Sequence, residues 1–215
     1  MIEELHRYPA PAPEPLGLAF NGTTLWIASR EAHRLYAVDP ATWKVGEEAE
    51  APGAPFGIAV ARDELAVVIG LGDDDDDRYI YRFVPGRGFS GSGIACPDLS
   101  GAHVAFDGGT LNLSQAHNRK ILALDAHGAV DREISLDRRP VGMTIIDGIF
   151  YLVTGDKDFK TLELTKVDAS GETPRVTSLA SIPFRARGLA FDGERFWTSH
   201  RDANEIVAFA MPKSV

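Results

Sequence analysis

The stretch GLAFNG at residues 17–22 recurs as GLAFDG at residues 188–193. Each copy is followed by a strand-like segment that carries a tryptophan, LWIAS at 25–29 and FWTSH at 196–200. Three weaker copies begin at residues 57, 103 and 142, so that neighbouring copies start 40, 46, 39 and 46 residues apart. Self-similarity of this period is typical of repeat architectures such as β-propellers. The repeat therefore decides the fold before any other feature of the chain does.

Each repeat begins with a short apolar segment and a turn such as Asn21–Gly22, followed by further strand-like segments. Repeats one to four have room for four strands, whereas the fifth has room for only three before Met211. An isolated strand at residues 2–8 is left over at the other end of the chain. We predict an all-β, five-bladed β-propeller with four-stranded antiparallel blades, in which the N-terminal strand completes the last blade.

The repeats predict one domain over residues 1–215, because a unit of about 43 residues cannot bury enough surface alone. The expected blades cover roughly residues 15–50, 55–92, 100–137, 140–180, and 186–211 together with 2–8. An open β-sandwich with a similar number of strands is the alternative. It would leave the regular spacing of the copies unexplained.

The composition indicates which classes of partner and which cellular compartment to expect. The 215 residues carry a net charge of -9, which disfavours a nucleic-acid partner because the phosphate backbone is also negative. Cys96 is the only cysteine, so no internal disulfide can form, as is usual in a reducing compartment. The sequence has no signal-peptide pattern and no apolar run long enough to cross a membrane. We therefore expect a cytoplasmic monomer without a membrane partner.

The pattern GLAFDG, followed by LW and later by VD, resembles the repeat of the β-propeller superfamily that includes the NHL-like, SMP-30-like and glutamine-cyclotransferase-like proteins. The resemblance covers essentially the whole chain, and the motif is structural rather than catalytic. The glutamine-cyclotransferase group has a similar five-bladed ring, but the glutamate of its first-blade motif falls at Ile27 and its glutamine at Leu16. The SMP-30 group holds a metal with a glutamate, whose place is roughly that of Glu14, but its Asn and Asp ligands have no match here. The resemblance thus implies the fold and carries neither activity over.

In a propeller, the connectors between blades and the loops between second and third strands surround one mouth of the central channel. We expect ligands to bind there. Four of the five repeats begin with glycine, whereas the third begins with His103. The last residue of the second strand also varies, being Ser29, Ile69, Gln115, Thr154 or His200. The candidate ligand-binding residues at this mouth are Glu14, His103, Gln115, His117, Arg139, Arg185, Arg187, His200 and Arg201.

Two interpretations of these residues compete. In the first, the mouth binds an anionic or polyhydroxylated small molecule, with Arg185, Arg187 or Arg201 on a carboxylate and His103 or His200 as the candidate general base. Its chemistry would be of the hydrolase, lyase or cyclotransferase kind, or binding alone. In the second, the polar groups satisfy backbone carbonyls and solvate the channel. The remaining alternative is a non-catalytic scaffold that binds a protein partner.

A metal site has weaker support. The run of five aspartates at residues 73–77 could offer Asp73, Asp75 and Asp77 to a hard cation such as Ca²⁺. It lacks the glycine and the distant glutamate of a calcium loop, and a run of like charges is usually a solvated loop. The three histidines of the mouth lack the close spacing of a zinc site. We therefore predict no cofactor.

The aromatic residues of the second strands have a structural interpretation. Trp26 and Trp197 hold the same repeat position, as does Tyr151 in the fourth repeat, whereas Asn112 takes it in the third. An aromatic residue that recurs at one repeat position predicts packing between blades. Trp43 lies outside this pattern, and we expect it to be exposed on an outer strand.

Overall fold

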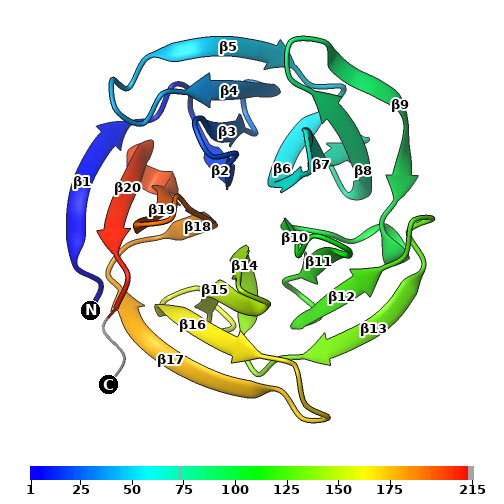
Figure 1. The fold of residues 1–215 in the computed structure, drawn as a ribbon, viewed down its shortest axis with the longest axis vertical. Coiled ribbons are helices and arrows are strands. Elements are labelled where there is room, and N and C mark those ends of the chain that lie inside the picture. The colour runs from blue at the N-terminus through cyan, green and yellow to red at the C-terminus, as the bar shows by residue number, and fades with distance from the viewer. Residues whose placement is uncertain (73, 213–215) are drawn as a thin grey trace.

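The computed structural model describes residues 1–72 and 74–212. Within these residues, the strands form five four-stranded antiparallel sheets that surround a central axis like the blades of a propeller (Figure 1). This arrangement confirms the predicted five-bladed ring, and the sandwich alternative is wrong. Two short 3-10 turns, η1 (Pro97–Leu99) and η2 (Arg201–Ala203), lie in the loops. In the described part of the chain, no helix has the length and apolar character that spanning a membrane requires.

Each blade runs from an inner strand near the axis to an outer strand at the rim. Blade 1 contains β2 (Pro15–Phe20), β3 (Leu25–Ser29), β4 (Arg34–Val38) and β5 (Val45–Glu50). Blade 2 contains β6 (Ala54–Ala61), β7 (Glu64–Leu71), β8 (Asp77–Val84) and β9 (Gly88–Ala95). Blade 3 contains β10 (Val104–Phe106), β11 (Leu111–Gln115), β12 (Lys120–Leu124) and β13 (Val130–Ser135). Blade 4 contains β14 (Arg139–Ile146), β15 (Ile149–Gly155), β16 (Leu162–Asp168) and β17 (Arg175–Ile182). Blade 5 contains β18 (Ala186–Phe191), β19 (Arg195–His200), β20 (Glu205–Ala210) and β1 (Glu4–Pro9).

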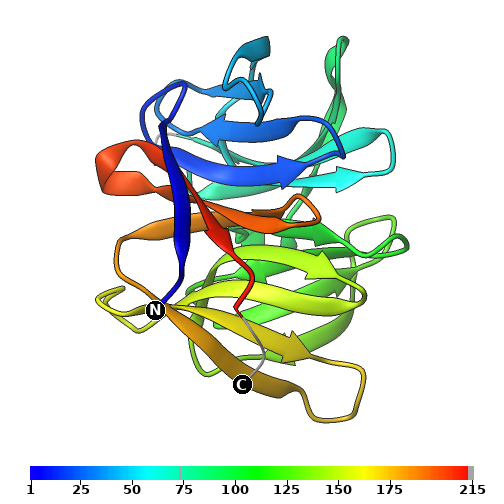
Figure 2. The same ribbon diagram turned by 60° about the vertical axis from the view of Figure 1, so that its left-hand side comes forward.

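The N-terminal strand closes the ring, as predicted. Strand β1 pairs antiparallel with β20, His6 opposite Ala208 and Pro9 opposite Glu205, and the two strands run side by side in Figure 2. Beyond the strand, the Ile2 N–H donates to Ser181 O of β17 at 2.9 Å, and the Ile2 side chain is buried. The first residues of the chain therefore join blade 5 and also anchor on blade 4.

The hydrophobic core consists of five clusters, one at each interface between neighbouring blades. Trp26 packs toward blade 2, with its ring 5.3 Å from that of Phe83, and Trp197 packs in the cluster between blades 5 and 1. The prediction that these tryptophans join blades is confirmed. Burial of apolar side chains at these five interfaces is what holds the blades together.

The prediction for Trp43 is wrong. Its ring stacks on Tyr8 of the closing strand with 4.2 Å between ring centres, and its Nε1 donates to Pro9 O at 2.8 Å. The outermost strand of blade 1 begins two residues later, at Val45. Trp43 thus lies in the turn before β5 and helps to hold β1. This contact joins segments that are distant in the sequence, so no local sequence pattern predicts it.

The glycines that begin the repeats allow the inner strands to approach one another. A Cβ atom on Gly17 would collide with the carbonyl oxygen of Phe56, and one on Gly188, whose φ is 63°, would collide with that of Leu16. His103 replaces such a glycine in blade 3, and it faces Gly57, where a Cβ atom would meet the His103 Cα. The ring therefore accepts a side chain at this position only in the third repeat.

Candidate functional site

One end of the central channel opens into a cavity of about 690 Å³. Its walls come from connectors between blades and from loops between second and third strands, the two sets of segments that the sequence places around one mouth. We call this cavity the charged mouth because of its ionisable lining residues, which are Arg30, Asp76, Asp77, Arg78, Asp98, His103, His117, Arg185, Arg187 and Arg201.

Arg187, at the start of β18, is the most deeply placed cation of the charged mouth. It is only 9% exposed, its Nη1 donates to Ala186 O at 2.9 Å, and its guanidinium lies 4.7 Å from the centre of the Phe159 ring. Among the residues that the structure describes, no carboxylate pairs with it. Burial, reinforced by the charges of Arg201 and Arg185, lowers the Arg187 pKa to about 10. The guanidinium is therefore charged at neutral pH and forms no ion pair with a carboxylate of the described residues.

The backbone that carries Arg187 is held firmly. The register between β18 and β19 shifts between Arg187 and Ala190, which marks a bulge. Two buried hydroxyl groups donate to the Arg187 carbonyl oxygen, Thr198 Oγ1 at 3.1 Å and Ser199 Oγ at 2.8 Å. These bonds fix the point from which the arginine enters the mouth.

His103 lines the same cavity from blade 3. It is 7% exposed, and its backbone N–H donates to Ser114 Oγ at 3.0 Å. Burial lowers the pKa of the imidazole to about 3, and the neighbouring Arg187 charge acts in the same direction. The ring is therefore neutral at physiological pH and offers a ligand one hydrogen-bond donor and one acceptor.

A second guanidinium, that of Arg78, enters the mouth from blade 2. Its central carbon lies 3.5 Å from the centre of the Phe56 ring, and the guanidinium of Arg30 approaches the same ring at 5.5 Å. Burial lowers the pKa of Arg78. Its Nη1 is buried and has no hydrogen-bond partner among the described residues. Phe56 thus supports two of the five arginines of the charged mouth.

The rim of the charged mouth is tied together by ion pairs. Arg30 pairs with Asp75 at 2.8 Å and with Glu14 at 3.8 Å, and Glu14 in turn accepts a hydrogen bond from Arg201 at 2.6 Å. The Glu14 N–H also donates to Asn204 Oδ1 at 3.0 Å. These ion pairs connect loops of blades 2, 1 and 5. The Glu14 carboxylate is therefore engaged in holding the rim.

The predicted site residues fall into two groups. Five line the charged mouth: His103, His117, Arg185, Arg187 and Arg201. Four lie elsewhere: Glu14, Gln115, Arg139 and His200. Glu14 belongs to the rim, and Arg139 lines a neighbouring cavity together with His117.

Gln115 and His200 end their strands near the mouth without facing it. The Gln115 amide is buried and donates to Pro97 O at 2.8 Å and to Ser100 O at 2.9 Å, so it holds the connector before blade 3. The His200 ring packs edge-on against Phe184 at 4.7 Å, and its Nδ1 lies 3.6 Å from Glu205 Oε2. Both side chains thus make local contacts and do not line the charged mouth.

Phe56, Arg78 and Phe159 also line the charged mouth, and the repeat pattern did not predict them. Phe159 lies in the loop between β15 and β16 with a φ of 55°. The carboxylate of Asp156 holds this loop, since it accepts bonds from the Thr161 hydroxyl at 2.7 Å and the Lys160 N–H at 2.9 Å. An aspartate at the start of a loop is a recognisable turn signal, but it does not say where the following aromatic side chain points.

The aspartate run does not gather metal ligands in the described residues. Asp75 pairs with Arg30, Asp77 begins β8, and Asp73 lies outside the described residues. No group of three or more His, Cys, Asp or Glu side chains suited to a metal occurs within residues 1–72 and 74–212. Cys96 is buried, and burial raises the pKa of its thiol to about 12, so it is not a thiolate at neutral pH.

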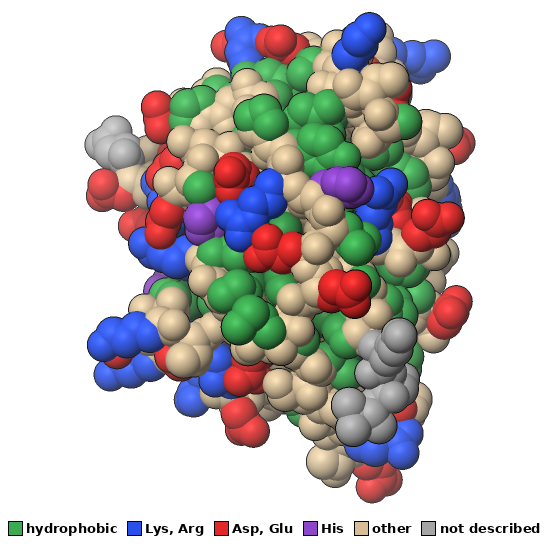
Figure 3. Space-filling model, turned by 90° about the vertical axis from the view of Figure 1, so that its left-hand side faces the viewer, with side chains coloured by type: hydrophobic (Ala, Val, Ile, Leu, Met, Phe, Trp, Pro, Cys, Tyr) green, Lys and Arg blue, Asp and Glu red, His purple; other side chains and the backbone are tan. Residues whose placement is uncertain are grey.

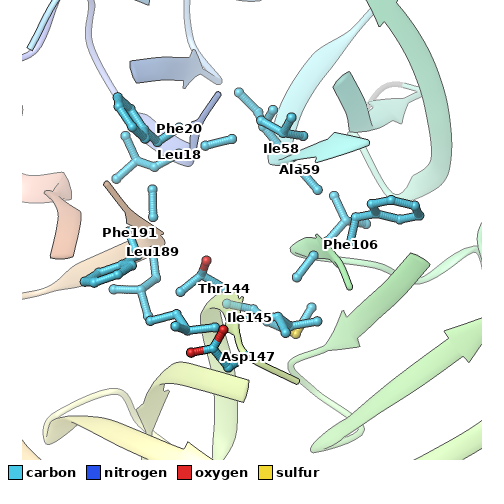
Figure 4. Close-up of a pocket in the computed structure, with 17 residues that line it drawn as sticks. Leu18, Phe20, Ile58, Ala59, Phe106, Thr144, Ile145, Asp147, Leu189 and Phe191 are labelled. Atoms are coloured by element: carbon cyan, nitrogen blue, oxygen red, sulfur yellow. The ribbon is translucent and has the colours of Figure 1, made fainter. Parts of the chain in front are cut away.

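The opposite end of the channel is different. A cavity of about 350 Å³ is lined by the inner strands of all five blades, and its labelled side chains are mainly leucine, isoleucine and phenylalanine (Figure 4). We call it the apolar mouth. Phe20, Phe106 and Phe191 hold the same repeat position there. Asp147, in the turn of blade 4, is its one charged lining residue.

Comparison with known proteins gives structural matches only. No family model matches the chain, and no curated protein matches it. A glutaminyl cyclase from Myxococcus xanthus superposes with a TM-score of 0.76 at 12% identity, over 99% of this chain and 97% of that chain. The PQQ-bound aldose sugar dehydrogenase from Streptomyces coelicolor gives 0.64 at 14% identity, over 97% of each chain. Regucalcin, a calcium-binding protein from Agrobacterium tumefaciens, gives 0.60 at 11% identity, over 97% of this chain and 94% of that chain.

At these identities the matches establish shape alone. The matched shape agrees with the closed ring of four-stranded blades and with the five repeats of the sequence. This chain therefore has the β-propeller fold found in NHL-like, SMP-30-like and glutamine-cyclotransferase-like proteins, here with five blades.

Proposed function

We propose that this protein binds a small anionic molecule in the charged mouth, with Arg187 as the principal contact. The observation that carries the proposal is a guanidinium that is 9% exposed, lines a cavity of about 690 Å³ and has no carboxylate partner among the described residues. A buried charge without a counter-ion is unfavourable for folding. A carboxylate or phosphate would supply the missing partner through charge-assisted hydrogen bonds.

The distribution of charge supports an anionic ligand. The chain as a whole carries a net charge of -9, yet five arginines and only three aspartates line this one cavity. Three of them, Arg30, Arg185 and Arg201, are ion-paired on the rim. Arg187 lies deeper, so an anion that enters past the rim meets an unpaired cation.

The state of His103 favours binding over catalysis as the first function to test. An imidazole with a pKa of about 3 is a poor proton acceptor at neutral pH. It is well suited to hydrogen-bond a ligand that Arg187 has already engaged. A reaction of the hydrolase, lyase or cyclotransferase kind would need another base.

The surface gives less support to a protein-binding scaffold. Large apolar side chains that are exposed among the described residues are spread over all five blades, for example Leu5, Val45, Ile94, Val130 and Val176. The outer wall near β1 has acidic and basic side chains mixed with apolar ones (Figure 3). A binding surface for a protein usually has one larger apolar patch.

The proposal is tested by screening small carboxylates, sugar acids and sugar phosphates for a rise in melting temperature, because a ligand that binds only the folded state stabilises it. Hits are then measured by calorimetry on wild type, Arg187→Gln and the control Arg87→Gln, whose exposed side chain lies in the turn between β8 and β9. Arg187→Gln should weaken binding by about 10- to 100-fold, the loss expected for one charge-assisted bond. Equal affinity in wild type and Arg187→Gln would contradict the proposal.

A further inference from the structure

A second cavity, of about 330 Å³, lies beside the charged mouth. Its walls come from the end of blade 3 and the start of blade 4, including the loop between β11 and β12, the connector to β14, and the loop after β15. We call it the basic groove. The ionisable residues that line it are His117, Arg119, Asp137, Arg138, Arg139 and Lys157.

The basic groove has a large local excess of positive charge. Four cationic side chains line it beside a single carboxylate, that of Asp137. Arg119 and Lys157 are exposed and Arg139 is half-buried, and these three form no ion pair within the described part of the chain. Such an excess of cations on a protein of net charge -9 raises the local concentration of anions.

Arg138 gives the groove a fixed wall. Its Nη2 donates to Thr161 O at 2.8 Å and to Thr161 Oγ1 at 3.0 Å, and Glu163 Oε2 lies 3.9 Å from its Nε. That Nε is buried and has no hydrogen-bond partner among the described residues. The guanidinium is thus held in place by the blade 4 loop and keeps unused donor capacity.

The basic groove adjoins the charged mouth. His117 lines both cavities. The ring of Phe159 is approached by Arg187, at 4.7 Å, and by Arg139, at 5.2 Å. Arg187 lines the charged mouth and Arg139 lines the groove, so one aromatic side chain supports a cation in each.

We infer that the ligand carries two acidic groups, phosphoryl or carboxylate, joined by a short spacer. The first binds at Arg187, and the second lies in the basic groove near Arg119 and Lys157. This inference rests on the proposed function and names the class of ligand for the same site. The groove carries the argument because its cations lie next to the charged mouth yet are not needed to hold an anion at Arg187.

The test uses α,ω-dicarboxylates from malonate to suberate, each with its half-amide, and a parallel series of bisphosphonates and monophosphonates. Affinities are measured by calorimetry on wild type, Arg187→Gln and the double variant Arg119→Gln/Lys157→Gln. The matched control is Arg87→Gln/Lys44→Gln, which removes one exposed arginine and one exposed lysine from turns between third and fourth strands, at the opposite face of the ring.

Wild type should bind the best-fitting two-ended anion about tenfold more tightly than its one-ended partner, because the second acidic group adds charge contacts to two exposed side chains, Arg119 and Lys157. Arg119→Gln/Lys157→Gln should lose this preference and keep its affinity for one-ended anions, whereas the control should keep both. Comparing the two series identifies phosphoryl or carboxylate as the preferred group.

Equal binding of one- and two-ended anions at every spacer length would overturn the inference. So would a preference that survives in Arg119→Gln/Lys157→Gln, or one that the control loses equally. In each of these cases, one-ended binding that still depends on Arg187 leaves the proposed function standing. Binding that is unaffected by Arg187→Gln would instead overturn the proposed function itself.

Discussion

The two ends of the channel are lined by different parts of the blades. The apolar mouth is lined by equivalent positions from all five repeats, including Phe20, Phe106 and Phe191. The charged mouth is lined by residues that differ from repeat to repeat, such as His103 and Arg187. Five blades can pack around one axis only if the repeated positions agree. Repeat positions that do not take part in this packing are free to differ, and the charged mouth forms at such positions.

Strand β18 contributes to both ends of the channel within three residues. Arg187 lines the charged mouth and Leu189 lines the apolar mouth, with the bulge at Gly188 between them. Substitutions at these two positions should therefore change stability in opposite directions.

The largest expected effect is at the apolar mouth. Leu189 is 1% exposed and belongs to the cluster between blades 4 and 5. Leu189→Ala should lower the free energy of unfolding by about 3 kcal/mol, because it removes buried methyl groups and leaves a cavity. Leu5→Ala, at a leucine that is 42% exposed, is the control and should change little. Urea denaturation measures both, and a loss below about 1 kcal/mol for Leu189→Ala would show that this end of the channel tolerates voids.

The next effect is a pH dependence that originates at the charged mouth. The folded-state pKa of His103 is about 3, below the ordinary histidine value of 6.5, so the unfolded chain binds more protons than the folded chain between these pH values. Stability should therefore fall as the pH is lowered from about 6.5 toward 3, by about 2 kcal/mol at pH 5 from this group alone. His103→Gln should remove that part of the acid sensitivity, measured as unfolding free energy at pH 7 and pH 5. Parallel losses in wild type and variant would contradict a buried neutral imidazole.

A smaller effect of opposite sign is expected at Arg187. Arg187→Met, measured without ligand, should raise the free energy of unfolding by about 1 kcal/mol, since it replaces an unpaired buried charge by an apolar side chain of similar length. Arg195→Met is the contrast. Arg195 also lies over an aromatic ring, that of Trp197 at 5.0 Å, but it pairs with Asp192 at 2.9 Å. Removing it should destabilise the protein, and a loss of stability in both variants would mean that Arg187 is already compensated.

The smallest effect is expected on the rim. Glu14→Gln breaks the contacts with Arg201 and Arg30, which are partly exposed. Such pairs contribute about 0.5–1 kcal/mol, and the difference from wild type should shrink at high salt because ions screen it. Thermal unfolding at two salt concentrations measures this. No loss in Glu14→Gln would mean that the Glu14 N–H bond to Asn204, which this variant keeps, holds the rim without help from the charge.

The fold could be predicted from the sequence because closure repeats its requirements five times. Gly17 and Gly188 recur where inner strands touch, and Trp26 and Trp197 recur where blades pack. A sequence repeat indicates the positions that have the same structural role in every blade. Trp43 occupies no recurring repeat position, since it contacts Tyr8 from a distant segment, and its partial burial could not be predicted.

The candidate site could be predicted only in part, for a related reason. Departures from the repeat identify unusual positions but not the direction of a side chain. His103 and Arg187 line the mouth, whereas His200 at an equally unusual position turns toward Phe184. Arg78 and Phe159 were missed because an alternating strand and a loop conceal which side chains reach the axis.

The pairing of β1 with β20 places the first strand of the chain in the last blade to be made. During synthesis, residues 4–9 must wait until residues 205–210 have emerged, so ring closure is necessarily a late event. Arg187 and Arg201 belong to that same blade, and Glu14 follows the waiting strand directly. The charged mouth therefore does not exist in a partly built chain, and a ligand that binds there can recognise only a finished molecule.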